Sequence, residues 1–218
     1  MRKPTTARSR VAREPRAEAR EARNKVYRAH IVEVAEDVFA DRGFESAKLQ
    51  EISARAGLSM GTIYALFPGK EDLFRAILEE KGQELLGVVR AVASRDEPPL
   101  AQLQALIEAY IDYFVAHPGF LRMHLRAGTS WVVSPDPNAE ARALVWREVH
   151  TLQADIFRRG IEAGVFVSED AGFLARLFSA MDQVLLADWV ATGMRATRDE
   201  LLARMRAIVE RTFCRAPL

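Results

Sequence analysis

The sequence contains only one cysteine, Cys214, among its 218 residues. This excludes a disulfide framework and a zinc site made of cysteines. No apolar run approaches the roughly 18–20 residues that cross a bilayer, and the Arg-rich N-terminus is not followed by the apolar segment of a signal peptide. These absences predict a cytoplasmic protein that does not enter a membrane.

The sequence also lacks the alternation of apolar and polar residues that is typical of β-strands. Apolar residues recur instead at helical spacing, and with 49% hydrophobic residues a packed core is expected. The pattern predicts an all-α protein of about nine helices. The expected helices are 24–42, a short one that ends at Gly57, 60–67, 70 to about 94, 99–116, 119–132, 138–163, 169–193 and 197–214.

Net charge is small, at +1, but it is distributed unevenly. Residues 1–28 contain 10 basic and 3 acidic residues, whereas residues 76–218 contain 16 basic and 19 acidic ones. A polyanionic partner is therefore expected to meet the N-terminal part of the chain. Residues 1–23 are predicted to form a basic, disordered arm. This arm either contacts phosphates or a flanking minor groove, or it is only a solvated tail.

The segment 46–74, SAKLQEISARAGLSMGTIYALFPGKEDLF, contains two short helical patterns separated by a glycine turn. This is the helix-turn-helix pattern, in which the N-terminal residues of the second helix approach base edges in a DNA major groove. Gly61 allows the backbone to approach DNA closely, and Tyr64 suits a phosphate oxygen. Lys70 opens the next helix, where its charge can share a phosphate with backbone N–H groups. A helical hairpin without a ligand is the alternative interpretation.

From Ala29 to Leu78 the sequence resembles the DNA-binding domain of the tetracycline-repressor-like (TetR/AcrR) family of bacterial regulators. The resemblance implies a helix-turn-helix domain at 24–75, with the motif at about 48–67, and a ligand-binding and dimerisation domain at 76–218. The residues that carry it are Ile31, Ala35, Phe39, Gly43-Phe44, Ile52-Ser53, Ala56-Gly57-Leu58-Ser59, Gly61-Thr62-Ile63-Tyr64, Phe67 and Lys70-Glu71-Asp72-Leu73.

Some positions depart from the family pattern. Ala47 stands where the family often has threonine, so Ser46 or Lys48 is expected to supply that contact. Met60 and Ala65 stand where polar residues are common, and we expect them to contact thymine methyl groups. The predicted DNA-binding residues are Lys48, Ser59, Met60, Gly61, Thr62, Tyr64, Ala65 and Lys70.

The expected helix 169–193 carries apolar residues on more than one face. A helix that is apolar all round must be buried all round, and in a chain of this size a second subunit is the natural other wall. The resemblance implies that this helix and helix 197–214 form a four-helix homodimer interface. A central helix in a monomeric bundle is the alternative. The expected interface residues are Phe173, Leu177, Met181, Val184, Leu185, Trp189, Leu202, Met205 and Val209.

The C-terminal region is also rich in aromatic residues, methionine and histidine, which suits a pocket for a small apolar or aromatic effector. Ordinary core packing is the alternative for each of these residues. Asp182 lies within an apolar helix, and it is expected to satisfy a polar group of the ligand or to pair across the dimer. The expected pocket residues are Tyr110, Phe114, Met123, His124, Trp131, Trp146, His150, Phe178 and Asp182.

The sequence lacks a catalytic pattern. His117, His124 and His150 fall on different expected elements without metal-ligand spacing, and there is no Gly-x-Ser-x-Gly, phosphate-binding loop or dinucleotide fingerprint. We therefore expect no enzyme activity, no metal and no cofactor. The predicted function is that of a dimeric, nucleoid-associated repressor that binds a palindromic operator in double-stranded DNA and is released by a small molecule. The alternative is a helical protein-interaction adaptor that no longer binds DNA.

Overall fold

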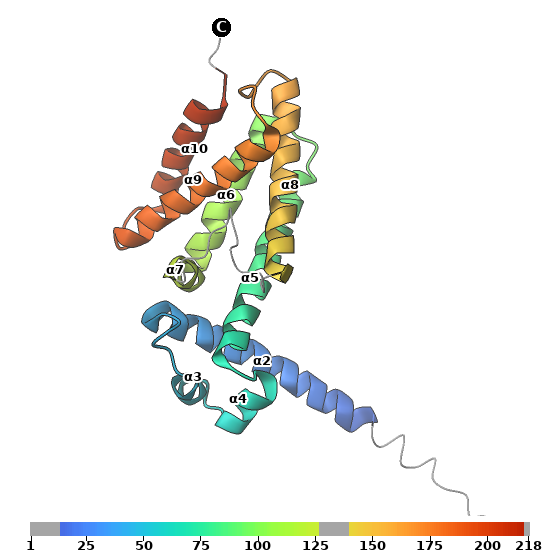
Figure 1. Ribbon diagram of the computed structural model, residues 1–218, viewed down its shortest axis with the longest axis vertical. Coiled ribbons are helices and arrows are strands. Elements are labelled where there is room, and N and C mark those ends of the chain that lie inside the picture. Colours follow the sequence, from blue (N-terminus) through green and yellow to red (C-terminus); the bar gives the residue numbers. More distant parts are fainter. Residues whose placement is uncertain (1–13, 127–139, 216–218) are drawn as a thin grey trace, which may run out of the picture. The chain divides into compact units, whose positions relative to one another are not determined.

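The computed structural model describes residues 14–126 and 140–215, and these parts of the chain are almost entirely helical (Figure 1). They contain nine helices and no strand longer than the isolated bridge between Phe166 and Cys214, which confirms the predicted all-α class. The helices are α2 (Glu14–Arg42), α3 (Leu49–Ala56), α4 (Met60–Leu66), α5 (Lys70–Ala93), α6 (Pro99–Ala116), α7 (Pro118–Arg126), α8 (Glu140–Glu162), α9 (Ala171–Ala191) and α10 (Arg198–Phe213). Within the same residues, no helix combines the length and the apolar character needed to cross a membrane.

The chain forms two compact units, which meet in sequence between Ala76 and Ile77. The first unit contains α2, α3, α4 and the first residues of α5, and the second contains the rest of α5 together with α6 to α10. Since α5 is continuous from Lys70 to Ala93, it contributes residues to both units.

The first helix begins earlier than expected. α2 begins at Glu14, so the expectation of a disordered arm over residues 1–23 is wrong for its second half; residues 1–13 lie outside the described residues. Alanine, glutamate and arginine, which dominate this stretch, are strong helix formers, and Glu21 precedes Lys25 by one turn. Apolar periodicity missed the helix because residues 17–23 are exposed and bury no apolar face.

The core of the first unit is made by the inner sides of α2, α3, α4 and the start of α5. Two further contacts fasten α2 to the motif: His30 Nε2 lies 3.2 Å from the Ala56 carbonyl oxygen, and the Arg28 guanidinium lies 4.5 Å from the centre of the Phe67 ring. The short helices α3 and α4 therefore depend on their neighbours for stability, as expected for helices of eight and seven residues. The largest buried side chains here are Ile31, Phe39, Ile52, Ile63, Phe67 and Leu73.

The core of the second unit is built around four buried phenylalanine rings from different elements. The centre of the Phe157 ring in α8 lies 5.3 Å from that of Phe166, which follows α8, and 5.0 Å from that of Phe213 in α10. Phe178 of α9 completes the group at 6.3 Å from Phe157. The Val167 N–H also donates to the Phe213 carbonyl at 2.8 Å. These contacts join α8, α9 and α10 at one end of the bundle.

Close packing at Gly160 gives a test of this core. A Cβ atom at Gly160 would lie 2.0 Å from Cδ2 of Phe166, whose ring is fully buried. We expect Gly160→Ala to lower the free energy of unfolding by about 1–3 kcal/mol, because the ring must leave its site against Phe157. Urea denaturation measures this change. Gly87→Ala in α5, where a Cβ has open space, is the control and should not destabilise the protein; equal effects of both variants would contradict the packing explanation.

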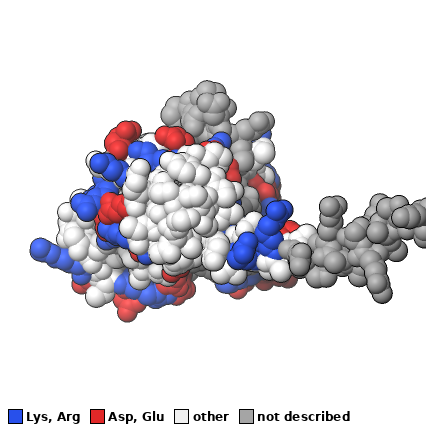
Figure 2. Space-filling view, turned by 90° about the horizontal axis from the view of Figure 1, so that it is seen from below, with Lys and Arg blue, Asp and Glu red and all other residues white. Residues whose placement is uncertain are grey.

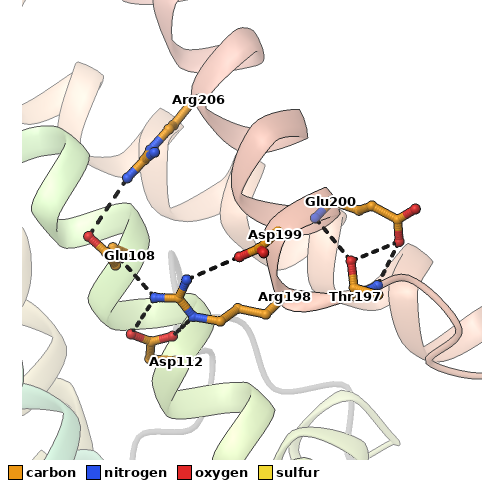
Figure 3. Close-up of polar contacts among 7 residues, drawn as sticks. All are labelled: Glu108, Asp112, Thr197, Arg198, Asp199, Glu200 and Arg206. Carbon is orange, nitrogen blue, oxygen red and sulfur yellow. Dashed lines mark hydrogen bonds and ion pairs between the residues drawn. The ribbon is translucent and has the colours of Figure 1, made fainter.

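A charged cluster fixes the start of α10 to α6 (Figure 3). Nη2 of Arg198 donates to Asp112 Oδ2 and to Glu108 Oε1, each at 2.9 Å, and its Nε also donates to Asp112. Thr197 and Glu200 cap the same helix end reciprocally. Exposed ion pairs contribute little stability, so the main consequence of this cluster is positional: it sets where α10 begins against the bundle.

Candidate functional site

The turn between α3 and α4 is held by backbone and side-chain hydrogen bonds. Gly57 follows α3 in the left-handed conformation, with φ of 64°, which glycine adopts without the strain that a side chain brings. The Leu58 N–H donates to the Ser53 carbonyl at 3.1 Å, and the buried Ser53 hydroxyl donates to the Leu58 carbonyl at 2.6 Å. These paired bonds fix the direction in which α4 leaves the turn. Sequence reasoning had not assigned this role to Ser53.

Ser59 begins α4 by capping it. Its Oγ accepts a hydrogen bond from the Thr62 N–H at 3.1 Å and lies 2.9 Å from the Thr62 hydroxyl oxygen. This is an N-cap, which stabilises a helix of seven residues that would be marginal by itself. In the free protein the two hydroxyl groups therefore contact each other, and both lie at the start of α4.

The outer face of α4 is exposed and uncharged. Gly61 and Ala65 are exposed, Tyr64 has 52% of its surface exposed and Met60 is half-buried, whereas Ile63 on the inner face is fully buried. α4 lies at the lower end of the first unit in Figure 1. Figure 2, which views the molecule from below, shows an area without charged side chains that is bordered by both basic and acidic side chains. Such a face can approach base edges, and the lysine and arginine side chains at its border can attract phosphates.

The lysines of the motif, Lys48 and Lys70, have different surroundings. Lys48 directly precedes α3, and its exposed side chain forms no cap hydrogen bond. The Lys70 ammonium donates to the carbonyls of Phe44 at 2.8 Å and Glu45 at 3.2 Å, and it lies 4.4 Å from the centre of the Phe44 ring. An ammonium group has three donors, so Lys70 spends two of them within the protein. Lys70 thereby holds residues 43–47 against the start of α5. The sequence had predicted a phosphate contact for Lys70 and not this positioning role.

The outer side of α9 is apolar and open to solvent. The exposed fraction is 47% for Phe173 and 69% for Val184, and Leu177 and Met181 between them are half-buried. The other expected interface residues have their side chains buried within the chain itself, because they lie on the inner sides of α9 and α10. These buried residues are Leu185, Trp189, Leu202, Met205 and Val209.

The expected pocket residues lie in the second unit with different degrees of burial. The centre of the Tyr110 ring lies 6.2 Å from that of Phe178, and the Trp146 ring lies 6.4 Å from the His150 ring. Trp131 lies outside the described residues. The buried members are Tyr110, Phe114, Met123, His124, Phe178 and Asp182, and the half-buried ones are Trp146 and His150.

A buried polar cluster connects part of this group through Gln153 and Ser179, which sequence reasoning missed. Gln153 Nε2 donates to the Tyr110 hydroxyl at 2.9 Å, and Gln153 Oε1 accepts from the Ser179 hydroxyl at 3.1 Å. Asp182, one turn after Ser179, is 2% exposed within the single chain, so its carboxyl group presents almost no surface to a second subunit. Burial raises the pKa of Asp182 to about 7. The sequence could have indicated Gln153 as a further pocket candidate, because it lies three residues after the expected pocket residue His150 on the same helix face.

Comparison with known proteins identifies the first unit. A model of the tetR family of bacterial regulatory proteins matches residues 31–77, which include the whole helix-turn-helix. Over 192 residues the chain is 28% identical to the HTH-type transcriptional repressor SCO4008 of Streptomyces coelicolor. That alignment covers 84% of this chain and 95% of the repressor, so the likeness also extends through the second unit.

Solved structures show the same fold. A putative transcriptional regulator from Saccharomonospora viridis in complex with choline has a TM-score of 0.72 at 22% identity, covering 87% of this chain and 98% of its own. The regulator FadR of Bacillus subtilis in complex with stearoyl-CoA has a TM-score of 0.70 at 17% identity, covering 84% of this chain and 95% of its own. Residues 31–77 therefore form a DNA-binding domain of the tetR family of bacterial regulatory proteins, and the chain is a DNA-binding transcriptional regulator.

Proposed function

We propose that the protein is a cytoplasmic, dimeric repressor that binds a palindromic operator and is released by a small-molecule effector. The observation that carries the proposal is the exposed, uncharged face of α4, presented by a turn that hydrogen bonds hold in place. A short helix of this kind has few reasons to expose Gly61 and Tyr64 unless a groove receives it. Repression is supported by the likeness to the repressor SCO4008 along most of both chains.

Each residue of the motif has a separate role in this proposal. Tyr64 and Lys48 contact phosphates and fix the register of the protein on the duplex. Met60 and Ala65 contact thymine methyl groups, and Gly61 permits close approach of the backbone. The hydroxyls of Ser59 and Thr62 lie at the N-terminus of α4, the end that reaches base edges. Lys70 acts indirectly, by holding the turn at 43–47 through the carbonyls of Phe44 and Glu45.

Dimerisation is proposed to use the outer side of α9. Phe173, Leu177, Met181 and Val184 recur at intervals of one helical turn, and they form a continuous apolar stripe. The inner side of the same helix is already covered by the chain's own bundle. A second copy that packs on the stripe by two-fold symmetry presents two α4 helices to a palindromic site.

The effector is proposed to bind in the second unit, near Asp182 and the polar cluster of Tyr110, Gln153 and Ser179. Two solved structures of this fold hold choline and stearoyl-CoA, so one fold accepts ligands of very different chemistry. The identity of the effector of this protein must therefore depend on its own side chains. Release of DNA requires only that the effector bind the DNA-free conformation more tightly, because such coupling is reciprocal.

The first experiment is to select fragments of the source genome on the purified full-length protein at about 150 mM salt, followed by sequencing. An enriched inverted repeat, with half-sites separated by about one helical turn of DNA or a multiple of it, is the expected result. Recovery of all fragments alike would contradict a specific operator. No recovery even at low salt would contradict DNA binding itself and favour the adaptor alternative.

Gly61→Ala separates DNA binding from stability. A Cβ atom at Gly61 would meet only the Ser59 Oγ, at 3.7 Å, which is ordinary contact. We expect a stability gain of about 0.5–1 kcal/mol, because alanine favours the helix, together with a loss of operator affinity of about ten-fold or more (~1.4 kcal/mol), because the methyl group keeps the backbone away from the bases. Fluorescence anisotropy and urea denaturation measure the two effects. Gly87→Ala, also in a helix, is the matched control and should leave operator affinity unchanged. Wild-type affinity in Gly61→Ala would show that the backbone does not approach DNA closely at this position.

A further inference from the structure

The buried polar cluster fixes how α8 and α9 lie against each other. Gln153 of α8 accepts from Ser179 of α9 at 3.1 Å and donates to Tyr110 of α6 at 2.9 Å. All three residues are buried. These hydrogen bonds use both the N–H and the oxygen of the Gln153 amide, so Gln153 needs no further partner. They fix the level at which α8 and α9 meet.

Asp182 and His150 occupy the next turn of the same two helices. His150 precedes Gln153 by three residues, and Asp182 follows Ser179 by three residues. α8 and α9 run in opposite directions (Figure 1). Three residues backward in α8 and three residues forward in α9 therefore lead in the same direction along the bundle, about one helical turn from the Gln153–Ser179 pair. The structure therefore brings the two residues to one level on adjacent helices.

Both of these residues carry a buried polar atom without a hydrogen bond. Within the described residues, neither Asp182 Oδ1 nor His150 Nε2 has a hydrogen-bond partner. Burial, and to a smaller extent Arg176, lowers the pKa of His150, so the imidazole is neutral at neutral pH and offers Asp182 no positive charge. Tyr110, which lies near Asp182, is also neutral, since burial and the neighbouring Asp182 raise its pKa. A buried carboxylate that lacks a partner is unfavourable unless something pairs with it.

We propose that the effector of this regulator carries a protonated amine that pairs with Asp182 Oδ1, attached to an apolar body that packs near Tyr110 and Phe178. This inference rests on the proposed function, since it names the chemistry of the effector at that same site. An ammonium group supplies both the missing charge and the missing hydrogen-bond donor. An anionic ligand placed there would be repelled by the carboxylate. His150 Nε2 can accept a second N–H from the same amine, because a neutral imidazole has one acceptor nitrogen.

Matched probes test the charge requirement. Phenylalkylamines of increasing chain length are compared with the corresponding alcohols and carboxylic acids on the full-length protein at about pH 8, where alkylamines remain protonated because their pKa resembles that of lysine. We expect at least one amine to raise the Tm by about 3 °C or more, and the alcohol and acid of the same length to have no such effect. The shift should disappear in Asp182→Asn and persist in Asp96→Asn, which alters an exposed carboxylate.

Three results would overturn the inference. They are the absence of a Tm shift with any amine, an equal shift in wild type and Asp182→Asn, and an equal Asp182-dependent shift with alcohols, which would identify a neutral hydrogen-bond donor instead. The proposed function is tested separately by adding the stabilising amine to the protein bound to its selected operator fragment, where release is expected. Specific DNA binding without any amine response would leave the regulator proposal standing and reject only the amine. An amine response in a protein that binds no DNA would support the amine inference and reject the regulator proposal.

Discussion

Replacing Val184 by aspartate is expected to convert the protein into a folded monomer that has lost about 100-fold or more of its operator affinity. Val184 is 69% exposed in the single chain, so the new carboxylate is hydrated in the monomer and the fold is retained. In the proposed dimer the same position lies in the apolar stripe with Met181, where a carboxylate would be buried without a partner. A monomer can engage only one half-site, and it loses the advantage of two linked contacts.

Size-exclusion chromatography with light scattering measures the mass, and anisotropy with the selected fragment measures the affinity. Leu144→Asp is the control, because Leu144 of α8 is also exposed, at 54%, but lies outside the stripe. This variant should remain dimeric and bind the operator as the wild type does. If Val184→Asp remains dimeric and binds the operator with normal affinity, the outer side of α9 does not form the dimer interface.

Asp182→Asn is expected to stabilise the protein at pH 8 and to have almost no effect near pH 4. The folded state holds the Asp182 proton more tightly than the unfolded chain, since the pKa rises from 3.8 to about 7 on burial. When folding raises the pKa of a carboxyl group, the free energy of unfolding falls as pH increases from the unfolded pKa to the folded pKa. Well below pH 4 the acid is protonated in both states, and above about pH 7 the full cost of burying the charge is present.

The magnitude follows from the size of the shift, at about 1.4 kcal/mol for each pKa unit. The difference between Asp182→Asn and wild type should therefore grow by on the order of 3–4 kcal/mol from pH 4 to pH 8. Urea denaturation of both proteins across this range isolates Asp182, because all other titrations are shared. Asp96→Asn, at an exposed position, should give a constant difference. A constant difference for Asp182→Asn as well would mean that its carboxylate is solvated or paired.

The helix-turn-helix could be predicted from the sequence because its requirements are local. Gly57 was recognisable as the end of a short helical pattern, and it ends α3 in the left-handed conformation. Ser59 stands directly before the second helical pattern, where serine favours an N-cap, and it accepts a hydrogen bond from the Thr62 N–H at the start of α4. Both features depend on neighbours within a few residues, so position in the chain was enough to identify them.

Long-range contacts could not be predicted in the same way. Lys70 was expected to contact a phosphate, but its ammonium group meets the carbonyls of Phe44 and Glu45, about twenty-five residues earlier. Gln153 reaches Tyr110, which lies 43 positions away. Nothing in the residues on either side of Lys70 or Gln153 indicates these partners.

The sequence by itself determined the all-α class, the two short helices of the motif and the apolar character of α9, because helix periodicity, caps and glycine turns act over a few residues. Only the tertiary structure decided which side of α9 is covered, so that Leu185 and Trp189 are core residues and Val184 is not. It alone placed Asp182 at the level of His150. The physical reason is that burial is a property of the elements packed against a residue, and a helix that is apolar on two sides does not specify which side its own chain will cover.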